Sequence, residues 1–296
     1  SKHKASFKVS VQPGQQSFEV EKGRKVILNS ALSAGLGFPH NCRVGSCTQC
    51  KCKLVSGKVK ELTDSSYVLS AEDLKAGMIL ACQSIPETDL EIEVELTSGG
   101  DRLVETRGTI VGQKELTHDI VELRVVLDDP MPFRAGQYAE IRLEEFSLSR
   151  NYSFAIAPKG QEANELVFHV RKVPGGRFTE WLFAESRVGS RLSTSGPYGE
   201  FYLRPAEGDD PAPIVCVAGG SGMAPILSLL EQAKWAGESR DAVYLFGART
   251  QRDLYAEDEI ASIQQGWRGS LSFKQVLSEE PAGSAWTGAR GYVTDE

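Results

Sequence analysis

The stretch that decides the fold of this chain is Pro39-His40-Asn41-Cys42-Arg43-Val44-Gly45-Ser46-Cys47-Thr48-Gln49-Cys50, which a further cysteine, Cys82, follows 32 residues later. Its three cysteines have the spacing C-x4-C-x2-C. In plant-type [2Fe–2S] sites, one such loop supplies three thiolates and a distant segment supplies the fourth. Structural zinc usually takes its ligands as two short pairs. The pattern therefore favours a cluster held by Cys42, Cys47, Cys50 and Cys82, with zinc or unligated thiols as the alternatives.

The residues around these cysteines suit a loop that wraps a cluster. Gly45 and Ser46 let the backbone fold tightly, so that amide N–H groups can point at anionic sulfur. Gly35 and Gly37 give conformational freedom where the chain enters the loop. We therefore expect the loop itself, and not only its thiols, to stabilise the cluster.

Cysteine usage points to a metal site in a reducing compartment. The chain has six cysteines among 296 residues, too few for a disulfide scaffold, and five of them lie in its first third. The two that are not expected ligands, Cys52 and Cys216, lie in apolar, strand-like segments. They are expected to be small buried hydrophobic residues.

Length and charge narrow the class of protein further. A chain of 296 residues fits two or three domains. A net charge of -7 argues against nucleic acid as a partner, because phosphate binding needs a basic face. No apolar run reaches the roughly 18 residues of a membrane helix, and the N-terminus shows no signal-peptide pattern. We expect a cytoplasmic protein with neither a nucleic-acid nor a membrane partner.

Three sequence patterns follow one another and predict three domains. Residues 1–98 combine alternating, strand-like segments with the cysteine loop, and a polar, Gly-rich linker follows at 99–105. Residues 106–205 contain many short β-rich runs separated by Gly and Pro, which predicts an antiparallel β-barrel. Residues 206–296 alternate strand, helix and strand, as in a parallel α/β sheet. The main elements expected are helices over 25–35, 179–184 and 225–235, and strands over 90–96, 214–218 and 242–246.

Two motifs in the second domain suit a flavin. The first is Arg150-Asn151-Tyr152-Ser153. An arginine can clamp a pyrophosphate with two parallel hydrogen bonds, an aromatic ring two residues later can pack on the isoalloxazine, and a small hydroxyl can approach its reactive nitrogen. Tyr152 and Ser153 are thus the candidate catalytic residues, although this short motif is common by chance.

The second flavin motif is His169-Val170-Arg171, followed by Gly175-Gly176-Arg177-Phe178-Thr179 and a helix. Two glycines before a helix leave free N–H groups at the positive end of its dipole, which suits a phosphate. His169 is included for its backbone position in this motif. The alternative is an ordinary helix start in which Thr179 is the capping residue.

A glycine-rich turn in the third domain suits a nicotinamide nucleotide. Val217-Ala218-Gly219-Gly220-Ser221-Gly222-Met223-Ala224-Pro225 joins an apolar strand to an apolar helix. Gly220 and Gly222 allow close approach of a pyrophosphate, Met223 is a further candidate in the same turn, and Pro225 suits the first turn of the helix. A glycine turn without a ligand is the alternative. Arg249, after the next strand, could accept a 2′-phosphate, which leaves NADPH possible.

Together these motifs resemble the bacterial oxygenase reductases of the benzoate dioxygenase reductase and methane monooxygenase reductase type. The resemblance implies a β-grasp [2Fe–2S] ferredoxin domain, an antiparallel barrel that binds FAD, and a parallel-sheet domain that binds NADH. It also implies an oxidoreductase that passes electrons from NAD(P)H through FAD and the cluster. The acceptor would be a terminal oxygenase or hydroxylase, or an intermediate ferredoxin.

The resemblance also leaves alternatives open. Family members continue for several dozen residues, so the chain is expected to be a fragment whose third domain is incomplete. The same modules could serve a deoxysugar-dehydrase reductase, or a carrier that does not oxidise NAD(P)H. Near the cysteines, Arg43, Lys51 and Lys53 suggest an acceptor with an acidic face, or simply a solvated charged rim.

Overall fold

The computed structural model describes residues 5–97, 102–160 and 164–296. They form two compact units, Ser1–Val104 (unit 1) and Glu105–Glu296 (unit 2). The linker expected at 99–105 falls partly on residues 98–101, which lie outside the described residues. Within the described residues, no helix is long and apolar enough to cross a membrane.

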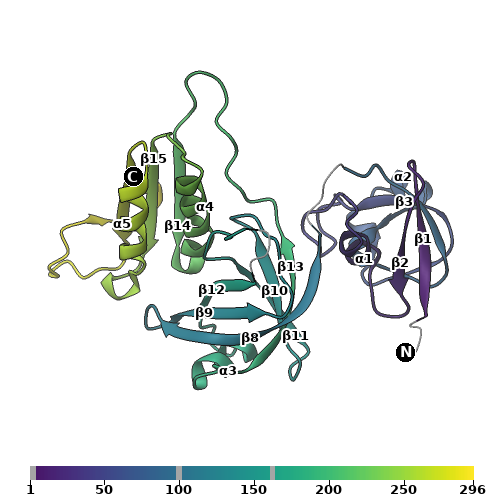
Figure 1. Cartoon of the computed structure of the whole chain (residues 1–296), viewed down its shortest axis with the longest axis horizontal. Helices are drawn as coiled ribbons and strands as arrows, with labels where there is room; N and C mark the ends of the chain where they lie inside the picture. The colour runs from purple at the N-terminus through teal and green to yellow at the C-terminus, as the bar shows by residue number, and fades with distance from the viewer. Residues whose placement is uncertain (1–4, 98–101, 161–163) are drawn as a thin grey trace. The chain divides into compact units, whose positions relative to one another are not determined.

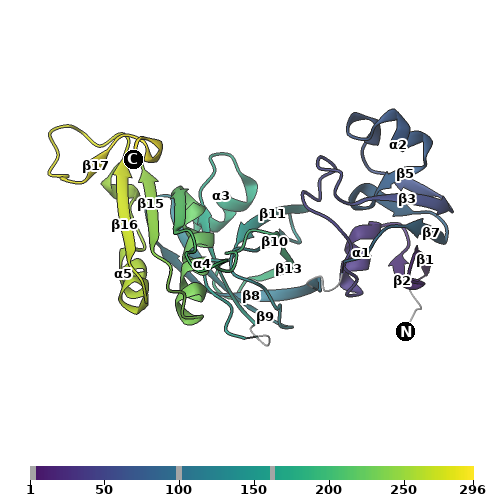
Figure 2. The same cartoon turned by 90° about the horizontal axis from the view of Figure 1, so that it is seen from above.

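Unit 1 is a β-grasp domain with a mixed five-stranded sheet. The strands lie in the order β2-β1-β7-β3-β5, with β1 antiparallel to β2 and parallel to β7 (Figure 2). These strands are β1 (Ser6–Gln12), β2 (Gln16–Glu21), β3 (Lys51–Ser56), β5 (Met78–Leu80) and β7 (Leu90–Glu93). The remaining elements are the small pair β4 (Val59–Glu61) and β6 (Ser84–Pro86), and the helices α1 (Ile27–Ser33) and α2 (Ala71–Lys75).

The core of unit 1 follows from period-two alternation against one helix. Val9, Val11 and Ile92 are fully buried on one face of the sheet, and α1 buries Ile27 and Leu28. Burial of such side chains contributes about 2 kcal/mol each. The helix predicted over 25–35 is confirmed but shorter. The strand predicted over 90–96 was too long, because β7 ends at Glu93 and Val94 N–H makes only one further bond, to the Gln12 carbonyl at 3.0 Å.

The first part of unit 2, which we call the barrel, is a six-stranded antiparallel sheet in the order β11-β10-β13-β8-β9-β12. An isolated bridge between Phe154 and Phe168 links the end of β11 to β12, so that the two edge strands meet. The alternate burial of β9 and β10 leaves their apolar side chains inside. The strands are β8 (Val104–Glu115), β9 (Ile120–Leu127), β10 (Tyr138–Leu143), β11 (Leu148–Ser153), β12 (Glu165–Arg171) and β13 (Arg191–Tyr198).

Helix α3 (Arg177–Ala184) begins two residues before the predicted start at 179. Its N-cap residue is Gly176, whose backbone carbonyl accepts the first helical hydrogen bond, from Glu180 N–H at 2.8 Å. The alternative in which Thr179 caps the helix is therefore wrong, since Thr179 lies inside its first turn.

The second part of unit 2, the nucleotide region, is a parallel sheet in the order β14-β15-β16-β17. Figure 1 shows α4 and α5 beside β14 and β15. The apolar faces of both helices form one buried cluster with Cys216, Tyr244 and Phe246, whereas Val215 and Val217 on the other face of the sheet are exposed. The elements are β14 (Ile214–Gly219), α4 (Met223–Trp235), β15 (Ala242–Ala248), α5 (Glu257–Gly266), β16 (Leu271–Leu277) and β17 (Ala289–Arg290).

Candidate functional site

The cysteine loop of unit 1 turns its amides toward its thiols. The N–H of Ser46 donates to Cys42 Sγ at 3.2 Å, the N–H of Val44 donates to the same sulfur at 3.4 Å, and the N–H of Cys42 donates to Cys47 Sγ at 3.4 Å. This geometry depends on left-handed backbone at three loop residues, Arg43, Gly45 and Thr48. Successive N–H groups of this kind form a concave site for anions.

The four thiols lie in two pairs. Cys42 hydrogen-bonds with Cys47, and the Cys50 thiol hydrogen-bonds with Cys82. In the described part of the chain, no three of the cysteine sulfurs lie within 4.8 Å of one another. A single zinc ion would draw all four sulfurs to about 2.3 Å from one point. Two pairs suit two iron atoms instead, so the donor set fits a [2Fe–2S] cluster better than zinc.

Hydrogen bonds also favour the anionic form of the Cys42 and Cys82 thiols. Burial raises the pKa of Cys42, but hydrogen bonds from Ser46 and Val44 lower it to about 6. A hydrogen bond from Cys50 lowers the pKa of Cys82 to about 7, and that same bond and burial raise the pKa of Cys50. Cluster ligands are thiolates, so this loop offers its sulfurs partly prepared for iron.

The two other cysteines behave as small buried residues. Cys52 lies on β3 and is fully buried, and burial raises the pKa of its thiol to about 12. Cys216 lies on β14, and burial raises the pKa of its thiol to about 11. Both remain protonated at neutral pH, as the apolar surroundings predicted.

The base of the cysteine loop is fixed by a close backbone approach at Gly37. Its carbonyl accepts hydrogen bonds from the N–H of Thr97 at 2.8 Å and from Thr97 Oγ1 at 3.1 Å. A Cβ at Gly37 would lie 2.0 Å from the Thr97 carbonyl oxygen, so no larger residue fits there. Gly35 has φ +80 but open space around it, and it provides the turn after α1.

The basic residues near the cluster loop differ in their contacts. Lys51 Nζ pairs with Asp73 Oδ1 at 3.2 Å, which lowers the pKa of that carboxyl. Lys53 is exposed on β3. The positive rim predicted from the sequence is therefore partly neutralised at Lys51.

The first flavin motif lies on β11, at the edge where the barrel closes. Arg150 is exposed and donates to the Ser149 carbonyl at 2.8 Å. The Tyr152 ring lies 5.8 Å from the Phe178 ring, and burial raises the pKa of the Tyr152 hydroxyl to about 12. Asn151 is exposed, and Ser153 faces Tyr138 in the neighbouring strand. The first motif and α3 thus meet at one aromatic contact.

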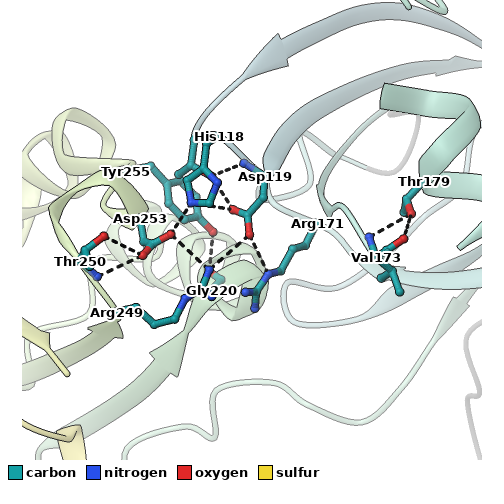
Figure 3. Close-up of polar contacts among 11 residues, drawn as sticks. His118, Asp119, Arg171, Val173, Thr179, Gly220, Arg249, Thr250, Asp253 and Tyr255 are labelled. Carbon is teal, nitrogen blue, oxygen red and sulfur yellow. Dashed lines mark hydrogen bonds and ion pairs between the residues drawn. The ribbon is translucent and has the colours of Figure 1, made fainter. Parts of the chain in front are cut away.

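The second flavin motif runs from the end of β12 to the start of α3. Gly176 supplies no side chain to the first amides of the helix, and Gly175 precedes it with φ +74. The Thr179 hydroxyl bonds to both backbone groups of Val173, at 3.0 Å and 3.1 Å (Figure 3). Its side chain therefore braces the turn, and the open amides of α3 are what a phosphate could use.

The first three residues of that motif, His169 to Arg171, face alternately in opposite directions. Val170 is buried in the barrel, whereas His169 and Arg171 point toward the nucleotide region. The His169 ring meets the edge of Tyr255 at 5.5 Å, and its buried Nδ1 has no hydrogen-bond partner among the described residues. Burial lowers the pKa of His169 to about 4, so the ring is neutral at pH 7.

The glycine turn of the nucleotide region occupies the carboxyl end of β14. Gly220 has φ +55 and its carbonyl accepts a hydrogen bond from the Tyr255 hydroxyl at 2.6 Å. Gly222 caps α4, whose third residue is Pro225. The Met223 side chain is fully buried and accepts from Tyr244, so only its backbone is open to a ligand.

A pocket of about 230 Å³ lies at the carboxyl ends of the parallel strands, where nucleotides bind in open α/β sheets. Gly220 lines it from the turn after β14, Gly247 and Val276 line it from β15 and β16, and Tyr292 lines it from the last residues of the chain. Arg249 also lines this pocket, one residue beyond the end of β15.

Five charged or titratable residues, the junction cluster, join the barrel to the nucleotide region (Figure 3), and all of them except His118 line this pocket. His118 Nε2 bonds to Asp253 Oδ1 at 2.6 Å, and Arg171 Nε donates to Asp119 Oδ2 at 3.2 Å. Arg249 Nη2 lies 3.7 Å from Asp119 Oδ2 and 3.6 Å from Asp253 Oδ1. Oxygen and nitrogen atoms of His118, Asp119 and Asp253 come close enough for a metal ion, but the two guanidiniums already balance both carboxylates.

Sequence reasoning missed His118, Asp119, Asp253 and Tyr255. Each belongs to a short turn with no motif of its own, and only folding brings those turns to the pocket. One signal was available in the sequence, the spacing of Thr250 and Asp253, which is typical of a reciprocal cap at a helix start. In the structure, Thr250 N–H donates to the Asp253 carboxylate at 3.1 Å.

Three family matches cover the chain in order. Residues 9–87 match the 2Fe-2S iron-sulfur cluster binding domain, residues 107–202 the oxidoreductase FAD-binding domain, and residues 216–296 the oxidoreductase NAD-binding domain. The fold and the site thus define an iron–sulfur flavoprotein oxidoreductase with a nicotinamide-binding domain.

Individual relatives narrow this class. The xylene/toluene monooxygenase electron transfer component XylA of Pseudomonas putida is 47% identical over 97% of this chain and 80% of its own length. The reductase component of propane 2-monooxygenase from Mycolicibacterium goodii is 32% identical over 98% of this chain and 84% of its own length. The crystal structure of the Amycolatopsis cytochrome P450 reductase GcoB matches with a TM-score of 0.83 at 33% identity, over 98% of this chain and 85% of that one. The chain belongs to the family of oxygenase reductase components.

Proposed function

We propose that this chain takes electrons from NADH and delivers them, through FAD and a [2Fe–2S] cluster, to the oxygenase component of a bacterial monooxygenase. The observation that supports this most directly is the 47% identity to a monooxygenase electron transfer component along 97% of the chain. The flavin, when bound, accepts a hydride, and the cluster carries single electrons. The relatives give no support to a deoxysugar-dehydrase partner or to a carrier that does not oxidise NAD(P)H.

In this function the cysteine loop holds the cluster and sets its charge. Cys42 and Cys47 would bind one iron, and Cys50 and Cys82 the other, because those are the hydrogen-bonded pairs. The N–H groups at Cys42 Sγ favour added negative charge on the site, which raises the reduction potential.

The flavin would lie against β11 and the start of α3. Arg150 and the amides in the first turn of α3, which follows Gly176, would bind its phosphates. The Tyr152 ring, neutral at pH 7, would pack on the isoalloxazine, with Ser153 near its reactive nitrogen. Phe178 would support this surface through its contact with the Tyr152 ring, and Thr179 would brace the turn at Val173. Asn151, Val170 and Gly175 belong to the same two motifs, whereas the side chains of His169 and Arg171 point toward the nucleotide region.

The nucleotide would bind in the 230 Å³ pocket with its pyrophosphate over Gly220 and Gly222. Met223 and Pro225 lie in the first turn of α4, whose N-terminus would face that phosphate. Arg249 is paired with two carboxylates, so it adds little net positive charge for a 2′-phosphate. This favours NADH over NADPH.

Two broader inferences accompany this function. We infer domain boundaries at 1–98, 106–205 and 206–296 with a linker at 99–105, which the family matches at 9–87, 107–202 and 216–296 support. We also infer a cytoplasmic location, which the unpaired cysteines and the bacterial sources of the relatives support. An intermediate ferredoxin is the alternative acceptor.

A visible spectrum of the purified chain tests the proposal. Flavin and cluster absorption that bleaches anaerobically with NADH is expected. Full bleaching by NADPH alone would contradict the nucleotide preference. A chain loaded with both cofactors that neither nucleotide bleaches would contradict the proposed function.

A further inference from the structure

Residues 249–255, which follow β15 and which we call the post-β15 segment, are held by the turn between β8 and β9. In Figure 3, His118 and Asp119 of that turn face Asp253 and Arg249 of the segment. His118 Nε2 lies 2.6 Å from Asp253 Oδ1, and Arg249 Nη2 lies 3.7 Å from Asp119 Oδ2. One short turn of the barrel therefore makes two polar contacts with this part of the nucleotide region.

Asp253 is also fixed within the post-β15 segment. The Thr250 N–H and the Thr250 hydroxyl donate to Asp253 Oδ2 at 3.1 Å and 3.2 Å, as part of a reciprocal cap. His118 thus contacts one oxygen of a carboxylate whose other oxygen is bound to the backbone of the segment. The position of His118 is therefore passed to the segment as a whole.

The post-β15 segment is connected to the glycine turn. The Tyr255 hydroxyl donates to the Gly220 carbonyl at 2.6 Å. Gly220, Arg249 and Asp253 all line the 230 Å³ pocket, but His118 does not. A change at His118 therefore reaches a bound nucleotide through its neighbours and not by direct contact.

The nucleotide region has a second attachment to the barrel, through α4. The Ser228 hydroxyl donates to the Ile156 carbonyl at 2.6 Å, and the Ala135 N–H donates to Gln232 Oε1 at 3.3 Å. Neither Ser228 nor Gln232 lines the 230 Å³ pocket. Loss of the contact at His118 therefore leaves the two regions attached, and it releases the post-β15 segment on the pocket side alone.

We propose that His118 is a positioning residue for hydride transfer. By holding Asp253, it sets where the post-β15 segment and the glycine turn place a bound nicotinamide relative to the flavin. The transfer breaks the C4–H bond of the dihydronicotinamide and forms an N–H bond on the flavin, so two electrons pass from the first to the second. It needs reacting atoms about 3 to 3.5 Å apart, and a displacement of about 1 Å can slow it about a hundredfold. The inference rests on the proposed function and extends it to a barrel residue outside the pocket.

Stopped-flow bleaching of the flavin by NADH, in the chain loaded with FAD and cluster, tests this. His118→Ala should lower the limiting rate at saturating NADH about tenfold, because the reacting atoms are displaced. The NAD⁺ dissociation constant should change little, because His118 makes no direct contact with the nucleotide. With NADH deuterated at the transferred position, the isotope effect on that rate should rise, because hydride transfer becomes the slow step.

Two further variants separate position from a general loss of structure. His118→Gln places an amide nitrogen close to the position of Nε2, so it should restore most of the rate. Ser228→Ala is the matched control, because it removes a hydrogen bond between the same two regions at α4. It should lower the free energy of unfolding without changing the limiting rate or the isotope effect.

Hydrogen exchange gives a readout that needs no turnover. In the loaded chain without nucleotide, the amide of Thr250, which donates to Asp253, should exchange faster in His118→Ala than in the unchanged chain. In Ser228→Ala it should exchange as in the unchanged chain. Unchanged exchange in His118→Ala would overturn the proposal, because His118 would not hold the segment.

Three kinetic outcomes also overturn it. An unchanged limiting rate in His118→Ala would mean that the post-β15 segment does not position the nucleotide. An equal loss of rate in Ser228→Ala would mean that any weaker attachment has this effect, and no recovery in His118→Gln would mean that the contact with Asp253 is not the cause. These results leave NADH bleaching of the unchanged chain, and with it the proposed function, intact. If neither NADH nor NADPH bleached the unchanged chain, both ideas would fail.

Discussion

The loop that carries Cys42, Cys47 and Cys50 spans nine residues, whereas the junction cluster brings together His118 and Asp253, which lie 135 residues apart. In the loop, amides of the same loop donate to the thiols of Cys42 and Cys47. In the junction cluster, every charge is balanced by a side chain from another segment. The difference teaches that a site made by its own backbone is visible in the sequence, and a site made by folding is not.

Loss of one cluster ligand is the largest effect expected. Cys82→Ala removes one sulfur from the Cys50–Cys82 pair, so the cluster absorption should disappear while flavin absorption remains. Because unit 2 keeps its own core, NADH should still bleach the flavin, but transfer to a one-electron acceptor should stop.

Cys52→Ala is the control for that experiment. Cys52 is equally buried and lies on β3, but it belongs to neither thiol pair. Its variant should keep the cluster spectrum. A cluster that survives Cys82→Ala, or is lost from Cys52→Ala, would contradict the ligand assignment.

These two regions also show how far the sequence could be used. The C-x4-C-x2-C spacing predicted the loop and its ligands, because three of the four thiols lie close in the chain. Alternation and the Gly-Pro breaks predicted the sheets in the same local way. The strand at Leu271–Leu277 and the helix at Glu257–Gly266 were missed, since their apolar faces are defined only by packing against β15 and α4.

The junction cluster could not be predicted for a related reason. Asp119 lies in a four-residue turn, and nothing in that turn indicates that Arg171 and Arg249 converge on it. Arg249 was correctly singled out as a charged residue after a strand, but its partners come from tertiary structure. The sequence therefore indicated a possible 2′-phosphate ligand without the carboxylates that balance it.

A buried histidine gives unit 2 a pH response. His169 is 6% exposed, and burial lowers its pKa to about 4 from 6.5. Between those values the unfolded chain binds the proton and the folded chain does not, so stability is full above pH 6.5 and falls as pH drops toward 4. The loss integrates to at most about 3 kcal/mol.

Unfolding of unit 2 in urea at several pH values between 7 and 4.5, with flavin release as the signal, measures this loss. His169→Gln should flatten the dependence on pH relative to the unchanged chain, since glutamine does not titrate. His40→Gln, in unit 1, serves as the control and should leave the slope of unit 2 as it was. If the free energy of unfolding of unit 2 changed equally with pH in all three proteins, His169 would already be protonated in the folded state.

The close approach at Gly37 predicts a smaller loss, confined to unit 1. In Gly37→Ala the new Cβ would lie 2.0 Å from the Thr97 carbonyl oxygen, which forces backbone movement at a cost of about 2 kcal/mol. Gly35→Ala meets no atom within 4 Å, and only its φ of +80 is strained, for about 1 kcal/mol. Urea titration of the cluster absorption should rank the two variants in that order, and the reverse order would refute the contact.

The smallest effect concerns Tyr255, which connects the barrel side of the junction to the glycine turn. Its hydroxyl donates to the Gly220 carbonyl at 2.6 Å, and its ring packs on His169 and on Phe246. Tyr255→Phe keeps both ring contacts and removes only the hydrogen bond, at a cost of about 1 kcal/mol. Because that bond fixes the left-handed Gly220, its loss should weaken NAD⁺ binding about fivefold.

Calorimetric titration of the loaded chain with NAD⁺ checks this, with Tyr202→Phe as the control because Tyr202 is exposed and lies outside the 230 Å³ pocket. The limiting rate of flavin bleaching should fall less in Tyr255→Phe than in His118→Ala, since the contacts of the junction cluster are kept. A larger fall would mean that the bond to Gly220, and not the contact between His118 and Asp253, positions the nucleotide. This variant therefore separates the two ways in which the junction acts on a nucleotide, through the backbone at Gly220 and through the contact of His118 with Asp253.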